Sequence, residues 1–495
     1  MTAEPGPDVG DPARSSEAHR AGRGAVASAI LQTSGRVFGF AFLLVATRVL
    51  DPQELGRYST AAGLFIFFGF IADFGTSLAV LRAVSAKSGA AHELLRGTLG
   101  LSLVLGVAAA AMAIAFGVVV GYPADTMRLV VVAALALPLS ALLTTVLAVL
   151  DGLGEIDRRA VLTLVQSAIV AGGGALALLL GLGAMGATAC LILGPAIVLP
   201  VALWLARRVS NWDGRIGHDR GATSQLFRAS IPFAVLGALA AITTRADLVV
   251  VSVLEDAAET ASYDVAVRSV EALSFLGAAI AGPTLYLLTR RLERGDGAAA
   301  QGALDVGLRL SYAIGLLMAA GVCAFSQPIV EILFGAEFDE AVGILCVLAV
   351  SLAASIAVSM LGTAVLAAGL AKQVIPLSTS LAVFVIATAL TGVAIVGAIG
   401  AAVAVALFKF VAVAGYSWML RSRVALAPRL PRPALLAGAI AVGALSFFAL
   451  SYAGLAVAIA TFVASVLLVA RFAARQEVDD LRRLLATLRP QGSGS

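Results

Sequence analysis

Charged residues are scarce in this chain of 495 residues, where Asp, Glu, Lys and Arg make up 13% against 60% hydrophobic residues. A soluble protein of this length has about a quarter of its residues charged. The composition therefore excludes a soluble domain. The formal net charge of +4 comes from basic residues scattered over many short segments, which argues against a nucleic-acid surface. We expect no nucleic acid among the partners.

Cysteine and histidine are equally rare, with three residues of each. Cys190, Cys323 and Cys346 lie in or beside apolar stretches and do not have the spacing of metal ligands. We interpret them as packing residues. The histidines lie in polar segments far apart in the sequence. The sequence therefore predicts no metal site and no disulfide.

Nucleotide-binding and catalytic features are also missing. No G-x-x-x-x-G-K-[ST] loop is present, since the only Lys followed by Ser or Thr is Lys87, which follows Ala86. The polar connections on one side of the predicted membrane spans have only two to ten residues. A membrane glycosyltransferase or polymerase needs a larger external loop for its chemistry. We expect no catalytic residues and no enzyme activity.

Long apolar runs dominate the sequence instead. About 20 apolar residues cross the roughly 30 Å of bilayer hydrocarbon as a helix. The runs are continuous rather than alternating, which excludes a membrane barrel. The sequence predicts an all-α polytopic membrane protein with about 14 transmembrane helices, at residues 25–50, 58–81, 97–120, 129–150, 160–182, 185–206, 229–254, 263–289, 306–330, 341–369, 374–396, 399–420, 433–452 and 455–472.

The basic residues set the expected orientation. Of the 34 Lys and Arg, 26 fall in alternate connections and in the two tails, and only Arg48, Arg57 and Arg128 fall in the others. Cytoplasmic loops carry the excess of Lys and Arg. Both termini are therefore expected in the cytoplasm of a bacterium, with the chain in its plasma membrane.

A faint internal repeat divides the chain. Val49-Leu50-Asp51 leads to Tyr58-Ser59-Thr60-Ala61, and Val253-Leu254-Glu255 leads to Tyr263-Asp264-Val265-Ala266. An offset of six spans preserves the direction of each helix, so the halves would be parallel repeats related by an axis along the membrane normal. The expected organisation is a disordered tail (1–24), an N-lobe of six spans (25–206), a cytoplasmic linker (207–228), a C-lobe of six spans (229–420), two further spans (421–472) and a second cytoplasmic tail (473–495).

Short motifs resemble a known family. Residues 46–59 (ATRVLDPQELGRYS), with Asp73-Phe74-Gly75 and Arg82, look like the first hairpin of the polysaccharide-export (Wzx-type) lipid-linked oligosaccharide flippases of the multidrug/oligosaccharidyl-lipid/polysaccharide exporter superfamily. Residues 244–266 are similar to the seventh and eighth helices of that family. Residues 333–338 (LFGAEF) resemble the external end of its ninth helix.

The resemblance implies alternating access of two lobes that moves an undecaprenyl-pyrophosphate-linked oligosaccharide from the cytoplasmic to the outer leaflet, for cell-surface or exopolysaccharide biosynthesis. The implied partners are this lipid-linked anionic glycan, membrane lipids, and the glycosyltransferases and polysaccharide polymerase of the same synthesis. The peptidoglycan-lipid branch is disfavoured because its Asp-Ala-Phe and Pro-Asn signature is replaced by Gly56-Arg57-Tyr58-Ser59. The drug-extruding branch typically has twelve helices, two fewer than expected here.

Charged residues inside the predicted spans are the candidate site. Insertion of one charged side chain at the bilayer centre costs roughly 2.5 to 3.5 kcal/mol, so such residues usually face a cavity or a partner. At about 1.5 Å per residue, Arg36 and Asp73 lie at one depth on adjacent helices. Arg245 and Glu271 match in depth in the same way in the second half. Asp264, Arg268 and Glu271 form a stripe along one helix face.

We interpret Arg36, Arg245, Arg268 and Lys409 as a cationic lumen for pyrophosphate and acidic sugars. Asp73, Asp247 and Glu271 would compensate these charges during the cycle. The competing interpretation makes the Arg36–Asp73 and Arg245–Glu271 pairs permanent structural links between helices. No cofactor is expected. Translocation would be driven by an H⁺ or Na⁺ gradient, or by the use of the product on the outside.

Two other functions stay open at this point. A cation-coupled multidrug exporter of the same superfamily would use the intramembrane acids for coupling. A scaffold that transports nothing would need none of these charges to move.

Overall fold

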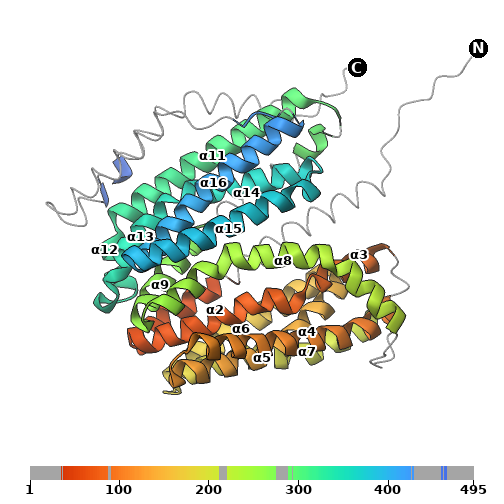
Figure 1. The fold of residues 1–495 in the computed structure, drawn as a ribbon, viewed down its shortest axis with the longest axis horizontal. Helices are drawn as coiled ribbons and strands as arrows, with labels where there is room; N and C mark the ends of the chain where they lie inside the picture. The colour runs from red at the N-terminus through yellow and green to blue at the C-terminus, as the bar shows by residue number, and fades with distance from the viewer. Residues whose placement is uncertain are drawn as a thin grey trace, which may run out of the picture.

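A computed structural model describes residues 35, 37–86, 91–210, 220–274, 288–292, 294–424, 426–428, 459–460 and 462–464. Throughout these residues the chain is helical, with turns and no strand (Figure 1). The expectation of an all-α polytopic membrane protein is confirmed.

The helices have the following bounds. After a helix at Val37–Val49 come α2 (Pro52–Asp73), α3 (Thr76–Ala86), α4 (Ala91–Val120), α5 (Ala124–Gly152), α6 (Ile156–Leu179), α7 (Gly183–Ser210), α8 (Arg220–Leu254), α9 (Ala257–Leu273), α11 (Gly297–Ala324), α12 (Ser326–Leu333), the short 3₁₀ helix η2 (Ala336–Phe338), α13 (Glu340–Val350), α14 (Leu352–Ala367), α15 (Ala371–Val396) and α16 (Ala398–Val424).

Among the described residues, nine helices are long and apolar enough to cross a membrane, or ten if one bent pair counts as a single span. The total of 14 is therefore not established. Most of the two last predicted spans, at 433–452 and 455–472, and the first part of the span at 25–50 lie outside the described residues. The two tails at 1–24 and 473–495 also lie outside them.

Three expected spans are interrupted among the described residues. The span predicted at 306–330 runs across Phe325, where α11 ends and α12 begins. The span predicted at 58–81 is broken between α2 and α3, where Phe74 and Gly75 have φ angles of 43° and 67°. The span predicted at 341–369 consists of α13 and α14, which meet at an angle of 42°. Hydropathy alone predicted each as one continuous helix, because it records apolar character and not backbone geometry.

Short polar caps start the two helices of the internal repeat in the same way. The Asp51 carboxylate accepts from the amide of Glu54 at 2.7 Å at the start of α2, and Asp256 accepts from the amide of Glu259 at 2.9 Å at the start of α9. Both caps satisfy amide groups that the first helical turn leaves free. The caps match Asp51 with Asp256. The sequence motif had instead matched Asp51 with Glu255, one residue earlier.

The helices pack as two bundles, one of α2–α7 and one of α11–α16 (Figure 1). Helix α8 lies between them, against α2 and α3 on one side and α15 and α16 on the other. Helix α9 packs against α2 and α13. The contact of α2 with α9 is close, since a Cβ atom at Gly56 would lie 1.6 Å from the Ala257 carbonyl oxygen. Helices α2 and α9, each the second helix of its repeated hairpin, are therefore direct neighbours.

One end of the structure carries the tight turns near Asp51, Tyr122, Gly181, Asp256, Gly335 and Gly397, and we call it the short-loop end. Helices α9, α12 and α13 lie at this end in Figure 1, and α3 lies at the opposite end. The main buried core runs across the contact between the bundles, since it includes Phe42 and Tyr58 on one side and Tyr263 and Phe334 on the other.

Candidate functional site

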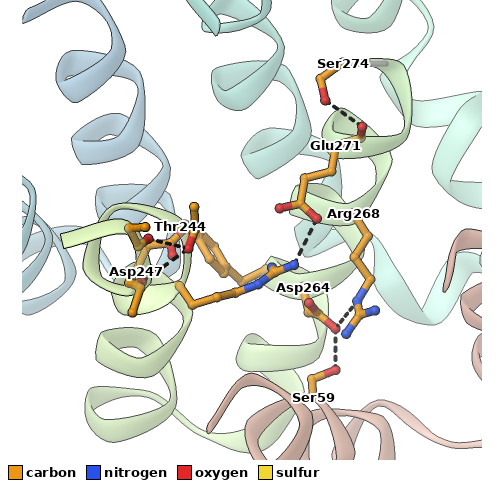
Figure 2. A network of polar contacts seen from close by, with 11 residues as sticks. Ser59, Thr244, Asp247, Asp264, Arg268, Glu271 and Ser274 are labelled. Atoms are coloured by element: carbon orange, nitrogen blue, oxygen red, sulfur yellow. Dashed lines mark hydrogen bonds and ion pairs between the residues drawn. The ribbon is translucent and has the colours of Figure 1, made fainter. Parts of the chain in front are cut away.

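Polar side chains from α2, α8 and α9 meet inside the apolar structure (Figure 2). They come from a part of the chain where lipid cannot supply hydrogen bonds. Each charged group there needs a partner from a neighbouring helix or turn. We call this set the interlobe cluster, and its members are Ser59, Arg245, Asp247, Tyr263, Asp264, Arg268, Glu271 and, on α16, Lys409.

Arg245 and Glu271 form an ion pair between α8 and α9. The Nη2 atom of Arg245 donates to Oε2 of Glu271 at 3.1 Å. This is the pairing that the matched depths predicted. The Arg245 side chain is 13% exposed and that of Glu271 is 40% exposed, so a ligand can reach this pair more easily than a sealed core contact.

A second ion pair is buried at the α2–α9 contact. Arg268 Nε donates to Asp264 Oδ2 at 2.7 Å, one helical turn away, and the Ser59 hydroxyl of α2 donates to the same oxygen at 2.7 Å. Asp264 is only 1% exposed. Its other oxygen, Oδ1, has no hydrogen-bond partner among the described residues. A buried carboxylate is thus held by one of its two oxygens.

Ser59 and Asp264 occupy equivalent positions in the two repeats. The helix caps pair Asp51 with Asp256, and the same offset of 205 residues pairs Ser59 with Asp264. Their hydrogen bond joins corresponding positions of α2 and α9, counted from the two caps.

The remaining members sit on the second-bundle side. The Tyr263 hydroxyl donates to Asp247 Oδ2 at 2.7 Å, which ties α9 to α8. Lys409 of α16 lies 5.1 Å from the centre of the adjacent Phe408 ring, and the negative charges that act on it are those of Asp247 and Glu271. Lys409 therefore belongs electrostatically to the same cluster.

The charges of the interlobe cluster balance. Three cations, Arg245, Arg268 and Lys409, lie among the three acids Asp247, Asp264 and Glu271. The cluster is therefore not a purely cationic cavity, and each of its two arginines already has an acid as partner. Sequence reasoning placed Asp264 on the stripe of α9 but gave it no role, and it missed Ser59 and Tyr263. The paired motifs Tyr58-Ser59 and Tyr263-Asp264 were the signal that could have found them.

Asp73 lies apart from the interlobe cluster, at the break between α2 and α3. Its Oδ2 accepts from the Ser77 hydroxyl at 2.8 Å and its Oδ1 from the Ser77 amide at 3.2 Å. Its carbonyl oxygen accepts from the Thr76 hydroxyl at 2.7 Å. In this structure the Asp73 carboxylate caps the start of α3. Its predicted partner, Arg36, lies outside the described residues.

Solved structures show the same fold. A structure of the lipid II flippase MurJ in an inward closed conformation has a TM-score of 0.74 and 14% identity, and the match covers 91% of this chain and 99% of that one. An inward-facing multidrug resistance MATE family transporter of the MOP superfamily has a TM-score of 0.63 and 16% identity, with 79% and 95% covered. A MOP superfamily transporter from Pyrococcus furiosus has a TM-score of 0.56 and 16% identity, with 81% and 96% covered.

Sequence comparison adds the family. No curated protein sequence matches the chain. A family model described as polysaccharide biosynthesis protein matches residues 21–286, which is more than half of the chain. The chain is thus a multi-pass membrane protein with the fold of MOP-superfamily flippases and exporters, and it belongs to the polysaccharide biosynthesis protein family.

Proposed function

We propose that this protein is a flippase that moves an undecaprenyl-pyrophosphate-linked oligosaccharide between the leaflets of a bacterial plasma membrane. The observation that carries the proposal is the interlobe cluster, which holds two arginines and a lysine inside the membrane between the bundles of a polysaccharide biosynthesis family member. Arginine binds phosphate oxygens in a bidentate way, and it stays charged when buried.

Arg245 is the first phosphate contact in this proposal, because its partner Glu271 is the most exposed acid of the two ion pairs. An incoming pyrophosphate displaces Glu271 from Arg245, and Arg268 and Lys409 add the further positive charge that a polyanion requires. Arg36 is proposed to extend this set from the first half. Asp247 and Glu271 then neutralise the cations when the headgroup leaves, and an H⁺ or Na⁺ gradient or use of the product drives the cycle.

The orientation is part of the proposal. The excess of Lys and Arg lies on the side opposite to the short-loop end, so we place both termini in the cytoplasm and the short-loop end outside. Alternating access would deliver the glycan to that side. The polymerase that extends the glycan would meet it there, and the glycosyltransferases would assemble it on the cytoplasmic side.

Complementation of a deletion strain tests the arginine role. Arg245→Ala should lower surface glycan at least tenfold at equal membrane abundance, because a charge-assisted hydrogen bond contributes about 1.5 to 3 kcal/mol. Arg245→Lys should retain part of the export, since lysine keeps the positive charge but lacks the planar guanidinium that binds phosphate through two nitrogens. Arg128→Ala is the matched control, because that arginine is 71% exposed and pairs with Asp125 of its own helix. Export by Arg245→Ala at the level of the control would rule out this site.

A cation-coupled exporter of small amphipathic drugs is the second candidate. The three acids of the interlobe cluster and the shared fold of multidrug transporters favour it. Drug-stimulated flux of H⁺ or Na⁺ in proteoliposomes, abolished by Asp247→Asn and unaffected by the lipid-linked glycan, would select this function over the first.

A further inference from the structure

The contacts at the short-loop end join the two bundles at several points besides Ser59 and Asp264. The guanidinium of Arg48 donates to the Ile332 carbonyl, and the rings of Phe40 and Phe334 meet edge to face at 6.1 Å. Gly56 allows the backbones of α2 and α9 to touch. Separation of the halves at this end must break all of these contacts.

Among these contacts, the Ser59–Asp264 hydrogen bond differs in ending on a carboxylate that is also paired with an arginine of the interlobe cluster. Arg48 and the phenylalanines contact backbone or rings, whereas the Ser59–Asp264 hydrogen bond shares its acceptor oxygen with Arg268. Arg268 makes this contact through Nε, on the side of the guanidinium nearest its own helix. The two terminal nitrogens of the same guanidinium carry further N–H groups that can donate to a second acceptor. Arg268 therefore connects the closed α2–α9 contact to the proposed phosphate route.

Arg268 supplies the positive charge that contacts the buried Asp264 carboxylate. Asp264 is 1% exposed, and its free Oδ1 already lacks a partner among the described residues. Removal of one partner of a buried ion pair leaves an uncompensated charge, which is strongly destabilising. If Arg268 turns away, the Ser59 hydroxyl alone must stabilise a buried carboxylate. Hydration of Asp264, by separation of α9 from α2, relieves that strain.

We propose that Ser59, Asp264 and Arg268 form a latch that keeps the two halves together at the short-loop end, and that an anionic pyrophosphate headgroup opens it by taking Arg268 from Asp264. The inference rests on the proposed function and adds a role for this pair. Cargo recognition and opening towards the receiving side are then one event. The latch joins α2 directly to α9, so one exchange of partners releases the contact between these two helices.

Distances between spin labels test the latch in the full chain in lipid nanodiscs. Labels at Ala124→Cys and Glu337→Cys, both exposed at the short-loop end on opposite bundles, are placed in a background with the three native cysteines changed to alanine. Without ligand, Ser59→Ala and Asp264→Asn should each populate a longer distance than the labelled parent. Ser269→Ala is the matched control, because its buried hydroxyl bonds only the Val265 carbonyl of its own helix at 2.7 Å.

A second measurement adds undecaprenyl pyrophosphate to the nanodisc, and undecaprenol, which lacks the pyrophosphate, serves as its control. The pyrophosphate should lengthen the distance in the labelled parent, and Arg268→Gln should show the long distance with and without it. Equal ligand-free distances in Ser59→Ala, Asp264→Asn and the control would overturn the latch. Binding of the pyrophosphate without a distance change would overturn the trigger. Failure of the pyrophosphate to bind would count against the proposed function, and the ligand-free variants would still decide the latch.

Discussion

At the scale of single residues, the cost of burying charge explains the site. Arg245 and Lys409 lie in the long apolar helices α8 and α16, Arg268 lies in the shorter and less apolar α9, and each has an acid nearby. The depth of Arg245 and Glu271 along a hairpin could be counted from the sequence, so their pairing was predictable. The Ser59–Asp264 hydrogen bond was not, because the paired Tyr58-Ser59 and Tyr263-Asp264 motifs mark both positions but do not reveal that α2 and α9 face each other.

Substitutions of Asp73 can distinguish its role as the cap of α3 from a role in ion coupling. Asp73→Asn keeps an oxygen that can accept from Ser77 and removes the charge, whereas Asp73→Ala removes the cap and should cost about 1 kcal/mol. We expect transport close to wild type for Asp73→Asn and a lower thermal midpoint for Asp73→Ala. Loss of transport in Asp73→Asn at normal stability would instead assign Asp73 to ion coupling.

Glu255 predicts a dependence of stability on pH. Burial, followed by the hydrogen bond and charge of Glu259 and the charge of Asp256, raises the pKa of Glu255 from 4.5 to about 7. The folded state therefore binds a proton more tightly than the unfolded state, so stability falls as pH rises from about 4.5 to about 7. The effect should be of the order of 1 kcal/mol because the site is partly hydrated.

Thermal unfolding in detergent at pH 5 and pH 7.5 measures this effect. Wild type should melt higher at pH 5, and Glu255→Gln should lose most of that difference. The hypothesis fails if the variant keeps the full pH dependence of the wild type. Glu331→Gln, an exposed acid bonded by Gln327 at 2.9 Å, is the control.

At the scale of helices, caps and glycines determine where a helix breaks and how closely two helices approach, and hydropathy records neither. The apolar runs predicted α4, α5, α7, α15 and α16 within several residues of their ends. The break after α2 was missed because it depends on Asp73 as a cap and on positive φ at Phe74 and Gly75. The close approach of α2 to α9 depends on Gly56, and one glycine in an apolar run does not reveal what it touches.

Gly56→Ala tests that approach. The added Cβ would lie 1.6 Å from the Ala257 carbonyl oxygen, so α2 and α9 must move apart. We expect a lower thermal midpoint in the ligand-free protein. Gly172→Ala is the control, since a Cβ there meets nothing within 4 Å and alanine favours a helix by up to about 1 kcal/mol. Equal midpoints for the two variants would show that the α2–α9 contact contributes nothing to stability.

At the scale of the whole molecule, the contact between the two bundles and the balanced charges of the interlobe cluster lie in the same place. The family, the all-α membrane fold and the superfamily resemblance followed from sequence motifs and apolar length. The neutral balance of the interlobe cluster did not, because it requires knowing which acids from different helices surround each cation. We therefore propose that the cations of the cluster bind the headgroup by exchange of ion-pair partners, since each already has an acid nearby.

The decisive experiment for the flippase is transfer of a labelled undecaprenyl-pyrophosphate-linked oligosaccharide across proteoliposome membranes. A glycosidase added outside reports the fraction of cargo that has crossed. We expect fast transfer by wild type and Arg128→Ala, and transfer near the protein-free rate for Arg245→Ala and Arg268→Ala. No transfer by wild type above protein-free liposomes, or equal transfer by all four proteins, would contradict this expectation.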